Sequence, residues 1–484
     1  GHGYIRSPKR PASAAALACI ILQSCQNDMH GGQSFAFFDR DMAKYAEQAD
    51  EEQVFQAMEA LIYNLNSMHS RAGAQVPFSS LNLGTDTSPG GRLVTKCLLE
   101  AHEKGLGRGE TPIFPNIIFR LKKGVNFEPT DPNYDLFQLA IRVASKRLNP
   151  TFSFMDSSFN QSYGSEVAYM GCRTRVIADR HGEAVTERRG NLSFTTINLP
   201  RLAIKAHGEL DTFYRGLDEL LDLAARQLYH RYRIQARLKV RDMPFLMGQG
   251  LYLDSAGLKP DDMIAGAIKH GTLSIGFIGL AEALVALTGN HHGQSIDSYE
   301  LGLEIVNYMK KRVDEYAEEY DLNYTLLATP AEGLSGRFIK MDRKLFGTIP
   351  GVTDKGYYTN SFHIPVAYDI SIAKKIALEG AFHRYANAGH ISYVELDAPP
   401  VHNPEAVEAI IRQMAESDMG YAGINFPIDE CRSCGTSGLF DDACTSCGSE
   451  DIRRVRRITG YLSTVDRFND GKAAELKDRK SHFI

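Results

Sequence analysis

Apolar residues recur at helical spacing in several long stretches of the chain. Residues 208–240 keep this spacing with few helix-breaking residues, and residues 303–320 repeat it. The apolar face of the second stretch consists of Val306, Met309, Val313, Tyr316 and Tyr320. At residues 403–416, Asn403 is suited to cap a helix and Pro404 to its first position. The stripe that follows consists of Val407, Ile410, Ile411 and Met414. We interpret these stripes as faces that pack against a core.

Short β-prone runs alternate with the helical stretches as far as residue 430. Residues 113–128 and 151–155 are such runs, and residues 71–86 predict a short strand that opens into a loop. Alternation of strands and helices is typical of α/β proteins. The pattern therefore predicts a mixed α/β barrel.

The N-terminal region has the outline of a signal peptide, because Lys9 and Arg10 precede the apolar residues 11–22. Residues 23–28 contain no small-residue cleavage signal, so we expect a buried helix instead. The chain has no run of about 18 apolar residues, the length that a membrane-spanning helix needs. We expect no membrane partner. Because residue 1 is Gly, we expect a fragment or a processed product.

The composition is that of a globular protein, with 484 residues of which 43% are apolar and 23% charged. The 54 Lys and Arg residues and 59 Asp and Glu residues give a net charge of −5. A mildly acidic balance disfavours a dedicated nucleic-acid-binding surface or a polybasic membrane anchor. We expect no nucleic-acid partner.

Four of the eight cysteines form a C-x2-C-x9-C-x2-C cluster. These are Cys431, Cys434, Cys444 and Cys447. Two C-x2-C knuckles can supply four thiolates to Zn²⁺, and the glycines Gly435, Gly438 and Gly448 permit the tight turns that knuckles need. Two disulfides or a redox pair are the alternatives, but no secretory signal or thioredoxin-like context supports them. Four thiolates leave no open position at the metal, so we expect a structural ion.

Two further segments, around Cys172 and Gly460, indicate a specific chemistry only when they are considered together. Cys172 follows a glycine, and in isolation such a cysteine is typical of a small buried hydrophobic residue. Its neighbours Arg173 and Arg175 would either lower the thiol pKa or form a solvated turn. Gly460 lies in a β-prone run just after the knuckles, where it indicates a bulge or a close backbone approach.

Three other segments permit two interpretations each. In residues 189–200, Asn191 and Ser193 can bond a sugar hydroxyl, and turn or cap chemistry explains them equally well. The glycines of residues 271–280 precede a helical pattern, where they serve phosphate binding or close packing. The arginines of residues 453–457 favour a solvated or ion-paired face over a nucleic-acid site.

Taken together, these segments resemble the anaerobic (class III) ribonucleoside-triphosphate reductases, the glycyl radical branch of the ribonucleotide reductases. The motifs occur in the family's order and span nearly the whole chain. The matching stretches are residues 26–33, 71–86, 167–176 and 190–201, the four-cysteine cluster, and residues 457–462 and 468–472. The resemblance implies a ten-stranded α/β barrel with a C-terminal zinc-knuckle and radical-loop region.

The resemblance also implies roles for single residues. Gly460 matches the glycine that stores the radical, and Cys172 matches the cysteine that becomes a thiyl radical. A glycyl radical is planar and shared between the flanking amides, so a side chain would crowd it. Asn191, with Ser193 beside it, falls where the family places polar residues against the substrate ribose. The four late cysteines match the family's zinc site, whose metal would fix the radical loop.

Several partners follow from the resemblance. A radical-SAM activating enzyme, which uses S-adenosylmethionine and an iron–sulfur cluster, installs the radical. The substrates are ribonucleoside triphosphates, the reductant is formate or a thioredoxin-type thiol, and deoxynucleotide triphosphates and ATP act as effectors. We expect a cytoplasmic homodimer. We also expect the family's N-terminal ATP-cone, and the early stretch with a second active-site cysteine, to be missing from this chain.

We expect three regions: a catalytic barrel in residues 1–425, zinc-binding knuckles in residues 426–452 and a glycyl radical segment in residues 453–484. Two other functions compete with reduction of nucleotides. Another glycyl radical enzyme is one, but an acyltransferase needs adjacent cysteines, which this chain lacks, and the dehydratases lack the knuckles. A catalytically silent zinc-ribbon scaffold is the other, and it would not need Cys172 and Gly460 together.

Overall fold

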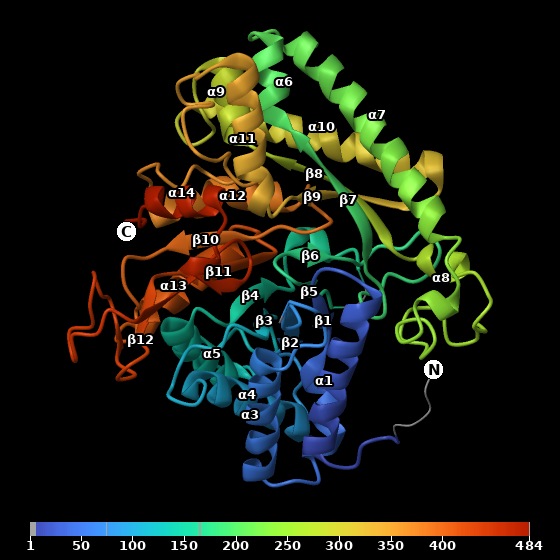
Figure 1. The fold of residues 1–484 in the computed structure, drawn as a ribbon, viewed down its shortest axis with the longest axis vertical. Coiled ribbons are helices and arrows are strands. Elements are labelled where there is room, and N and C mark those ends of the chain that lie inside the picture. The colour runs from blue at the N-terminus through green and yellow to red at the C-terminus, as the bar shows by residue number, and fades with distance from the viewer. Residues whose placement is uncertain (1–5, 74, 164–165, 484) are drawn as a thin grey trace.

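The computed structural model describes residues 6–73, 75–163 and 166–483, and its strands lie between two groups of helices (Figure 1). The larger sheet has the order β1-β2-β3-β4-β11-β10. Its strands are β1 (Gln33–Phe35), β2 (Ser79–Leu83), β3 (Asn116–Leu121), β4 (Thr151–Phe154), β10 (Ser392–Glu395) and β11 (Tyr421–Asn425). Strands β1 to β4 are parallel, β11 is antiparallel to β4, and β10 is parallel to β11.

Helices from the N-terminal third cover the larger sheet. They are α1 (Pro11–Asp28), α2 (Phe38–Ala46), α3 (Glu51–Ser67), α4 (Pro89–Lys104) and α5 (Tyr134–Arg147). Together with α13 (Pro404–Glu416), they bury one apolar core against strands β2, β3, β4 and β11. Burial of this apolar face stabilises both the helices and the sheet.

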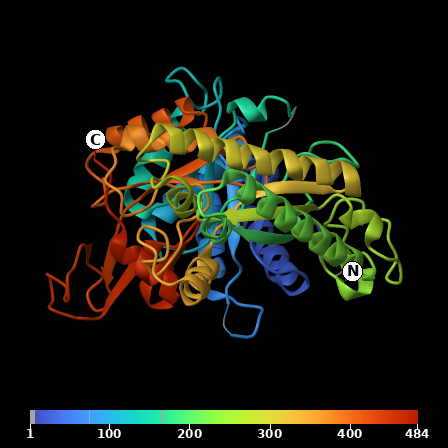
Figure 2. The same cartoon turned by 90° about the horizontal axis from the view of Figure 1, so that it is seen from above.

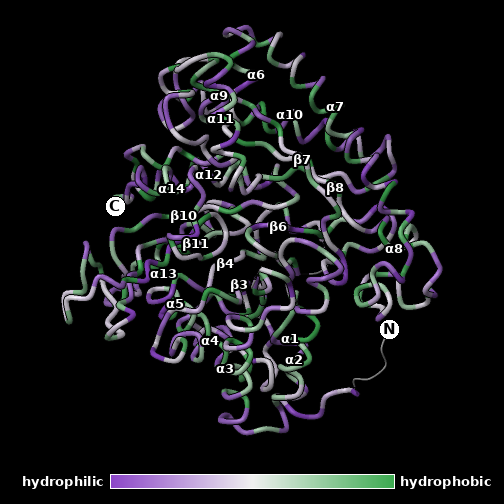
Figure 3. The backbone as a smooth tube through the Cα atoms, in the orientation of Figure 1, coloured by the Kyte–Doolittle hydropathy of each residue, from purple (hydrophilic) through white to green (hydrophobic). Residues whose placement is uncertain are grey.

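A second core forms around a parallel three-stranded sheet. Its strands are β7 (Asn191–Asn198), β8 (Thr272–Ile278) and β9 (Asn323–Ala328), in that order. The helices of this core are α6 (Leu199–Ala206), α7 (Leu210–Gln235), α9 (Leu280–Thr288) and α10 (Ile296–Tyr320). Helices α7 and α10 lie across the same side of the sheet (Figure 2). Hydrophobic and hydrophilic residues alternate along α7, as a half-buried helix requires (Figure 3).

The remaining elements are further helices, a short hairpin and another sheet. The helices are α8 (Ala265–Ile268), α11 (Glu332–Phe346), α12 (Ile372–His383) and α14 (Asp470–Asp478). Strands β5 (Tyr169–Met170) and β6 (Thr174–Arg175) form a short hairpin. A four-stranded sheet, in the order β13-β12-β14-β15, consists of β12 (Ile428–Cys431), β13 (Ser437–Gly438), β14 (Ile452–Arg457) and β15 (Leu462–Thr464).

The predicted helices are present, with shifted ends. The third stretch begins as predicted, because the Asn403 side chain accepts a hydrogen bond from the Ala406 amide and Pro404 opens the helix. The second stretch extends back to Ile296, where Ser295 caps it. The N-terminal apolar stretch is helix α1, whose buried face includes Ala15, Cys19 and Leu22. Within the described residues, no helix combines the length and the apolar character needed to span a bilayer.

The α/β class is confirmed, but the described strands do not pair as a closed ten-stranded barrel. Hydrogen bonding gives separate sheets of six and three strands. The β5–β6 hairpin approaches the second sheet through single bridges from Gly389 to Thr174 and to Leu327. Gly389 has φ +143°, and a Cβ there would lie 2.2 Å from the Arg173 carbonyl oxygen. Strand pairing between the hairpin and the second sheet is interrupted at Gly389, because tight loops replace regular strands there.

The glycines of residues 271–280 serve close packing. Gly276 lies in β8, where a Cβ would come within 2.0 Å of Thr329 Oγ1. Gly279, with φ +73°, makes the turn from β8 into α9, a conformation that side chains disfavour. These contacts explain the glycines without a phosphate.

Asp429 links the strands of the four-stranded sheet. Its buried carboxylate pairs with Arg454 at 2.9 Å and Arg456 at 2.8 Å, and accepts a hydrogen bond from the Phe440 amide. The arginines of residues 453–457 therefore form the ion-paired face that the sequence favoured, with Arg453 bound to Glu430.

We predict that Asp429→Asn lowers the free energy of unfolding by about 2 kcal/mol, because it removes the buried carboxylate that pairs with the partly exposed Arg454 and Arg456. The matched control is Asp135→Asn, since Asp135 pairs with Arg92 but its side chain is 64% exposed. The control should cost less than about 1 kcal/mol. Urea unfolding followed by circular dichroism measures both, and equal losses would contradict the prediction.

Candidate active site

Cys172 lies in the turn of the β5–β6 hairpin, and polar side chains of β2 hold the strand that leads to it. Asn82 donates from Nδ2 to the Tyr169 carbonyl at 2.9 Å and accepts from the Tyr169 amide at 3.1 Å. Ser80 Oγ accepts from the Gly171 amide at 3.1 Å. Strand β2, which is buried along its whole length, therefore fixes the position of the Cys172 loop.

Gly460 lies in the turn that joins β14 to β15, and the Ile458 amide closes this turn on the Tyr461 carbonyl at 3.0 Å. Arg479, which directly follows the C-terminal helix α14, supports the turn. Arg479 donates from Nη1 to the Arg457 carbonyl at 2.8 Å and from Nη2 to the Ile458 carbonyl at 3.1 Å. Two antiparallel strands and one arginine therefore define the path of the Gly460 loop.

The two loops touch backbone to backbone. A Cβ placed on Gly460 would lie 1.9 Å from the Cys172 carbonyl oxygen and 2.3 Å from its Cα. No side chain fits at such distances, so glycine is required there by packing as well as by any radical chemistry. The structure thus brings together Gly460 and Cys172, the pair that the sequence singled out from distant parts of the chain.

The Cys172 thiol is protonated at neutral pH. Burial raises its pKa to about 11, and the neighbouring Arg173 opposes this rise without cancelling it. The option of a lowered pKa, which the flanking arginines suggested, is therefore wrong: desolvation of the charged form outweighs their attraction. A thiol that keeps its hydrogen is suited to hydrogen-atom transfer and poorly suited to nucleophilic attack.

Glu332, which no sequence motif singled out, faces the two loops from the start of α11. Tyr461 donates to its carboxylate at 3.1 Å, and burial raises the Glu332 pKa. The Glu332 carboxylate also acts electrostatically on the Cys172 thiol and raises its pKa. The available signal was an acidic residue at a helix start, preceded by a buried strand and the residues Thr329-Pro330-Ala331.

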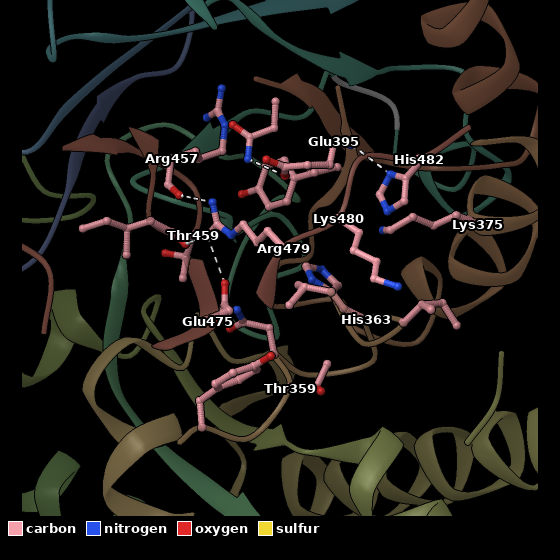
Figure 4. Close-up of a pocket in the computed structure, with 17 residues that line it drawn as sticks. Thr359, His363, Lys375, Glu395, Arg457, Thr459, Glu475, Arg479, Lys480 and His482 are labelled. Carbon is pink, nitrogen blue, oxygen red and sulfur yellow. Dashed lines mark hydrogen bonds and ion pairs between the residues drawn. The ribbon is translucent and has the colours of Figure 1, made fainter. Parts of the chain in front are cut away.

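Behind the Gly460 loop lies a cavity of about 40 Å³, which Figure 4 shows surrounded by charged side chains. Arg457 and Thr459 of the loop line it, facing Glu475 and Arg479 of the C-terminal segment. This volume suits a few water molecules and is far too small for a nucleotide. Glu475 is held by two cations, since Lys472 Nζ donates to it at 2.6 Å and Arg479 Nη2 at 2.9 Å.

Asn191 and Ser193 lie on β7, and the structure does not bring them to this cavity. Asn191 Nδ2 donates to Ser274 Oγ at 2.7 Å and to Thr272 Oγ1 at 3.0 Å on the adjacent strand. Ser193 accepts a hydrogen bond from Arg231 of α7 at 2.9 Å. These contacts support the sheet, and a role at the substrate ribose stays a prediction.

The four late cysteines form two similar knuckles. In each, the amide of the first cysteine donates to the residue five positions on, and a glycine amide donates back: Gly435 to the Cys431 carbonyl, and Gly448 to the Cys444 carbonyl. Both glycines have positive φ, at +79° and +73°. These turns point the four sulfur atoms of the cluster inward.

The sulfur atoms fit a tetrahedral metal. All four lie within 4.8 Å of one another, with Cys431 and Cys447 at 3.6 Å and Cys434 and Cys444 also at 3.6 Å. Zinc bound by four thiolates at about 2.3 Å separates them by about 3.8 Å. Cys431 ends β12, which pairs with β14, and β14 leads to the Gly460 turn. The cluster is therefore connected to the Gly460 loop through one pair of strands.

Comparison with known proteins matches the whole chain to the family that the sequence motifs resemble. A model of the family described as anaerobic ribonucleoside-triphosphate reductase matches residues 1–482. The enzyme of that name from Salmonella typhimurium is 35% identical over 524 residues, covering 100% of this chain and 72% of its own length. The one from Enterobacteria phage T4 is 33% identical, covering 100% of this chain and 84% of its own length.

Solved structures agree on the fold. An anaerobic ribonucleotide reductase superposes with a TM-score of 0.76 at 16% identity, covering 100% of this chain and 78% of its own. The Thermotoga maritima enzyme in complex with dATP and CTP gives 0.71 at 16% identity, covering 98% and 79%. The B12-independent glycerol dehydratase of Clostridium butyricum gives 0.70 at 12% identity, covering 99% and 68%. The fold is thus shared more widely than the sequence, and by its sequence this chain belongs to the anaerobic ribonucleoside-triphosphate reductase family.

Proposed function

We propose that this chain reduces ribonucleoside triphosphates to 2′-deoxyribonucleoside triphosphates, with a radical stored on Gly460 and used through Cys172. The observation that carries this proposal is the backbone contact between the two loops, where a Cβ on Gly460 would lie 1.9 Å from the Cys172 carbonyl oxygen. Radical transfer between a carbon and a sulfur needs such proximity, because the hydrogen atom moves across a near-contact distance.

The steps balance in atoms and electrons. Cys172 gives its thiol hydrogen atom to the Gly460 Cα, so the S–H bond breaks, a C–H bond forms and the unpaired electron moves to sulfur. The sulfur then takes the 3′-hydrogen of the ribose, and the 2′-hydroxyl leaves with a proton as water. Loss of this water leaves a radical at C2′ beside a 3′-ketone. Formate, oxidised to CO2, or a dithiol, oxidised to a disulfide, supplies two electrons, and with two protons these form the C2′–H bond and convert the ketone to a hydroxyl-bearing radical at C3′. Cys172 then returns its hydrogen atom to C3′, and its sulfur takes a hydrogen atom from the Gly460 Cα to restore the glycyl radical.

The surroundings of Cys172 support this order of events. Because its pKa is raised to about 11, the thiol carries a transferable hydrogen atom throughout the neutral range. Asn191 and Ser193 are the side chains that we assign to the ribose, on the basis of their position in the family's motif. Their present bonds to Ser274 and Arg231 would have to be shared or exchanged when a nucleotide binds.

We assign a structural Zn²⁺ to Cys431, Cys434, Cys444 and Cys447. The ion would crosslink residues 426–452, which we treat as the knuckle region between the catalytic residues 1–425 and the radical segment 453–484. Its chemistry is that of a closed four-thiolate site, which supplies folding energy and no open coordination position. The thiolates hold the end of β12, and through its pairing with β14 they stabilise the Gly460 turn.

The remaining partners follow from family membership. We propose a radical-SAM activating enzyme, which uses S-adenosylmethionine and an iron–sulfur cluster to remove a hydrogen atom from Gly460, and effector binding by deoxynucleotide triphosphates and ATP in a homodimer. The dATP and CTP bound by the Thermotoga maritima relative support nucleotide binding. A reducing compartment, the cytoplasm, suits a chain whose described cysteines form no disulfide bonds.

We predict that anaerobic activation produces a glycyl radical, seen as a doublet by electron paramagnetic resonance, and that Gly460→Ala abolishes it. Alanine there collides with the Cys172 backbone and crowds the planar radical. The matched control is Gly266→Ala, since a Cβ on Gly266 meets nothing within 4 Å. Air exposure of the activated parent should cut the chain at Gly460, which mass spectrometry detects. A full signal in Gly460→Ala would refute the assignment.

We predict that Cys172→Ser keeps the glycyl radical but forms no deoxynucleotide, since a serine O–H bond is too strong for Gly460 to take its hydrogen. Product analysis with CTP should show a loss of at least about 1000-fold, comparable to removal of an essential nucleophile. Cys97→Ser is the control, because Cys97 is buried in α4 and does not touch the Gly460 loop. Full turnover in Cys172→Ser would exclude the thiyl mechanism.

We predict one zinc ion per chain, bound by the four-cysteine cluster. Cys434→Ala should lose the ion, lower the yield of glycyl radical severalfold and loosen the Gly460 loop, while distant regions keep their folding. Elemental analysis measures the metal, and hydrogen exchange of residues 453–464 measures the loosening. Metal-free protein that activates as well as the parent would show that the cluster does not support the loop.

A further inference from the structure

Asn116 contacts both loops of the active site. It is the first residue of β3 and is 2% exposed, beside its register partner Ser80 on β2. Its Nδ2 atom donates to the Gly460 carbonyl at 3.0 Å and to the Gly171 carbonyl at 3.3 Å. Ser80 Oγ meanwhile accepts from the Gly171 amide, so neighbouring strands hold both polar backbone groups of Gly171.

We propose that Asn116 is a positioning residue that sets the distance over which the hydrogen atom passes between Cys172 and Gly460. The proposal rests on the radical function assigned above. One amide group with two hydrogens ties the carbonyl of the radical glycine to the carbonyl just before the cysteine. Because β3 is a buried interior strand of the six-stranded sheet, this tie fixes both loops to a regular, hydrogen-bonded element.

Only an amide side chain of this length meets the requirement. Both acceptors are carbonyl oxygens, so an aspartate would place a carboxylate oxygen against each of them. The Asn116 Oδ1 atom is buried and has no hydrogen-bond partner among the described residues. An unpaired buried acceptor costs free energy. Since Oδ1 makes no hydrogen bond, the two hydrogen bonds donated by Nδ2 determine the orientation of the amide.

The bond to Gly460 also acts on the radical itself. A radical at Cα is conjugated with the carbonyl of the same residue, so part of the unpaired spin lies on the oxygen that Asn116 binds. A hydrogen bond to this oxygen draws electron density toward it and changes the spin density left on Cα. Loss of the bond therefore alters the spectrum of the radical, which a purely structural side chain would leave unchanged.

The experiment compares Asn116→Asp and Asn116→Leu with Asn126→Asp in the full chain after anaerobic activation. Asn126 is a matched control, because it is fully buried and its Nδ2 also bridges two carbonyls, those of Gly84 at 2.9 Å and Arg120 at 2.8 Å. We expect the Asn116 variants to lose about 100-fold in kcat for CTP, with KM within about twofold, and to show changed hyperfine splitting of the glycyl signal. The control should keep both.

Parent-like kcat and spectrum in folded Asn116 variants would overturn the proposal, as would a loss no larger than that of the control. If those variants do not fold, Asn116→Gln provides the test, since it keeps the amide but moves it by one methylene and so alters both of its hydrogen bonds. It should lower kcat and change the glycyl signal, and parent-like values of both overturn the proposal. Failure of the proposed function is distinct, because the activated parent would then form neither radical nor deoxynucleotide.

Discussion

The structure depends on one contact, that between the backbones of Gly460 and Cys172. Hydrogen-atom transfer requires near contact of carbon and sulfur, and a glycine lets two backbones approach closely enough. The distance of 1.9 Å between a notional Cβ on Gly460 and the Cys172 carbonyl oxygen shows that any side chain would force the loops apart. The same absence of a side chain leaves a Cα radical planar, so packing and chemistry demand one residue type at one position.

The fold holds this contact by hydrogen-bonding each loop to a sheet of its own, in addition to the Asn116 side chain that the two loops share. The Cys172 loop is hydrogen-bonded to Ser80 and Asn82 of the six-stranded sheet. The Gly460 turn belongs to the four-stranded sheet, with Arg479 of the C-terminal segment bonded to the carbonyls before it. A loop carries high conformational entropy when free, so a contact between two loops persists only when rigid elements order both.

Local features of the fold were predictable from the sequence, and long-range features were not. Helix α13 follows from Asn403, Pro404 and an apolar stripe, because capping and periodicity act within a few residues. The four-cysteine cluster follows from spacing alone. Strand pairing between distant parts of the chain has no such local signature. The ten-stranded barrel therefore came from the resemblance alone, and the described strands pair in separate sheets instead. The meeting of Cys172 and Gly460 came from the family's motifs, and Glu332 was missed because one acidic residue at a helix start is common.

The eight cysteines show how surroundings divide one residue type between two kinds of chemistry. Burial raises the pKa of Cys97 and of Cys25 to about 12, as it raises that of Cys172 to about 11, so a protonated thiol is not by itself a functional mark. What separates Cys172 is a glycine backbone against its own. The knuckle cysteines lie instead in glycine turns whose amides orient the sulfur atoms toward one point, where thiolates can share a metal. A hydrogen atom can leave a buried neutral thiol at no cost in charge, whereas a metal needs the thiolate. A thiyl site and a metal site would therefore need opposite protonation states, and strands β12 and β14 separate the knuckle cysteines from the Gly460 turn against which Cys172 lies.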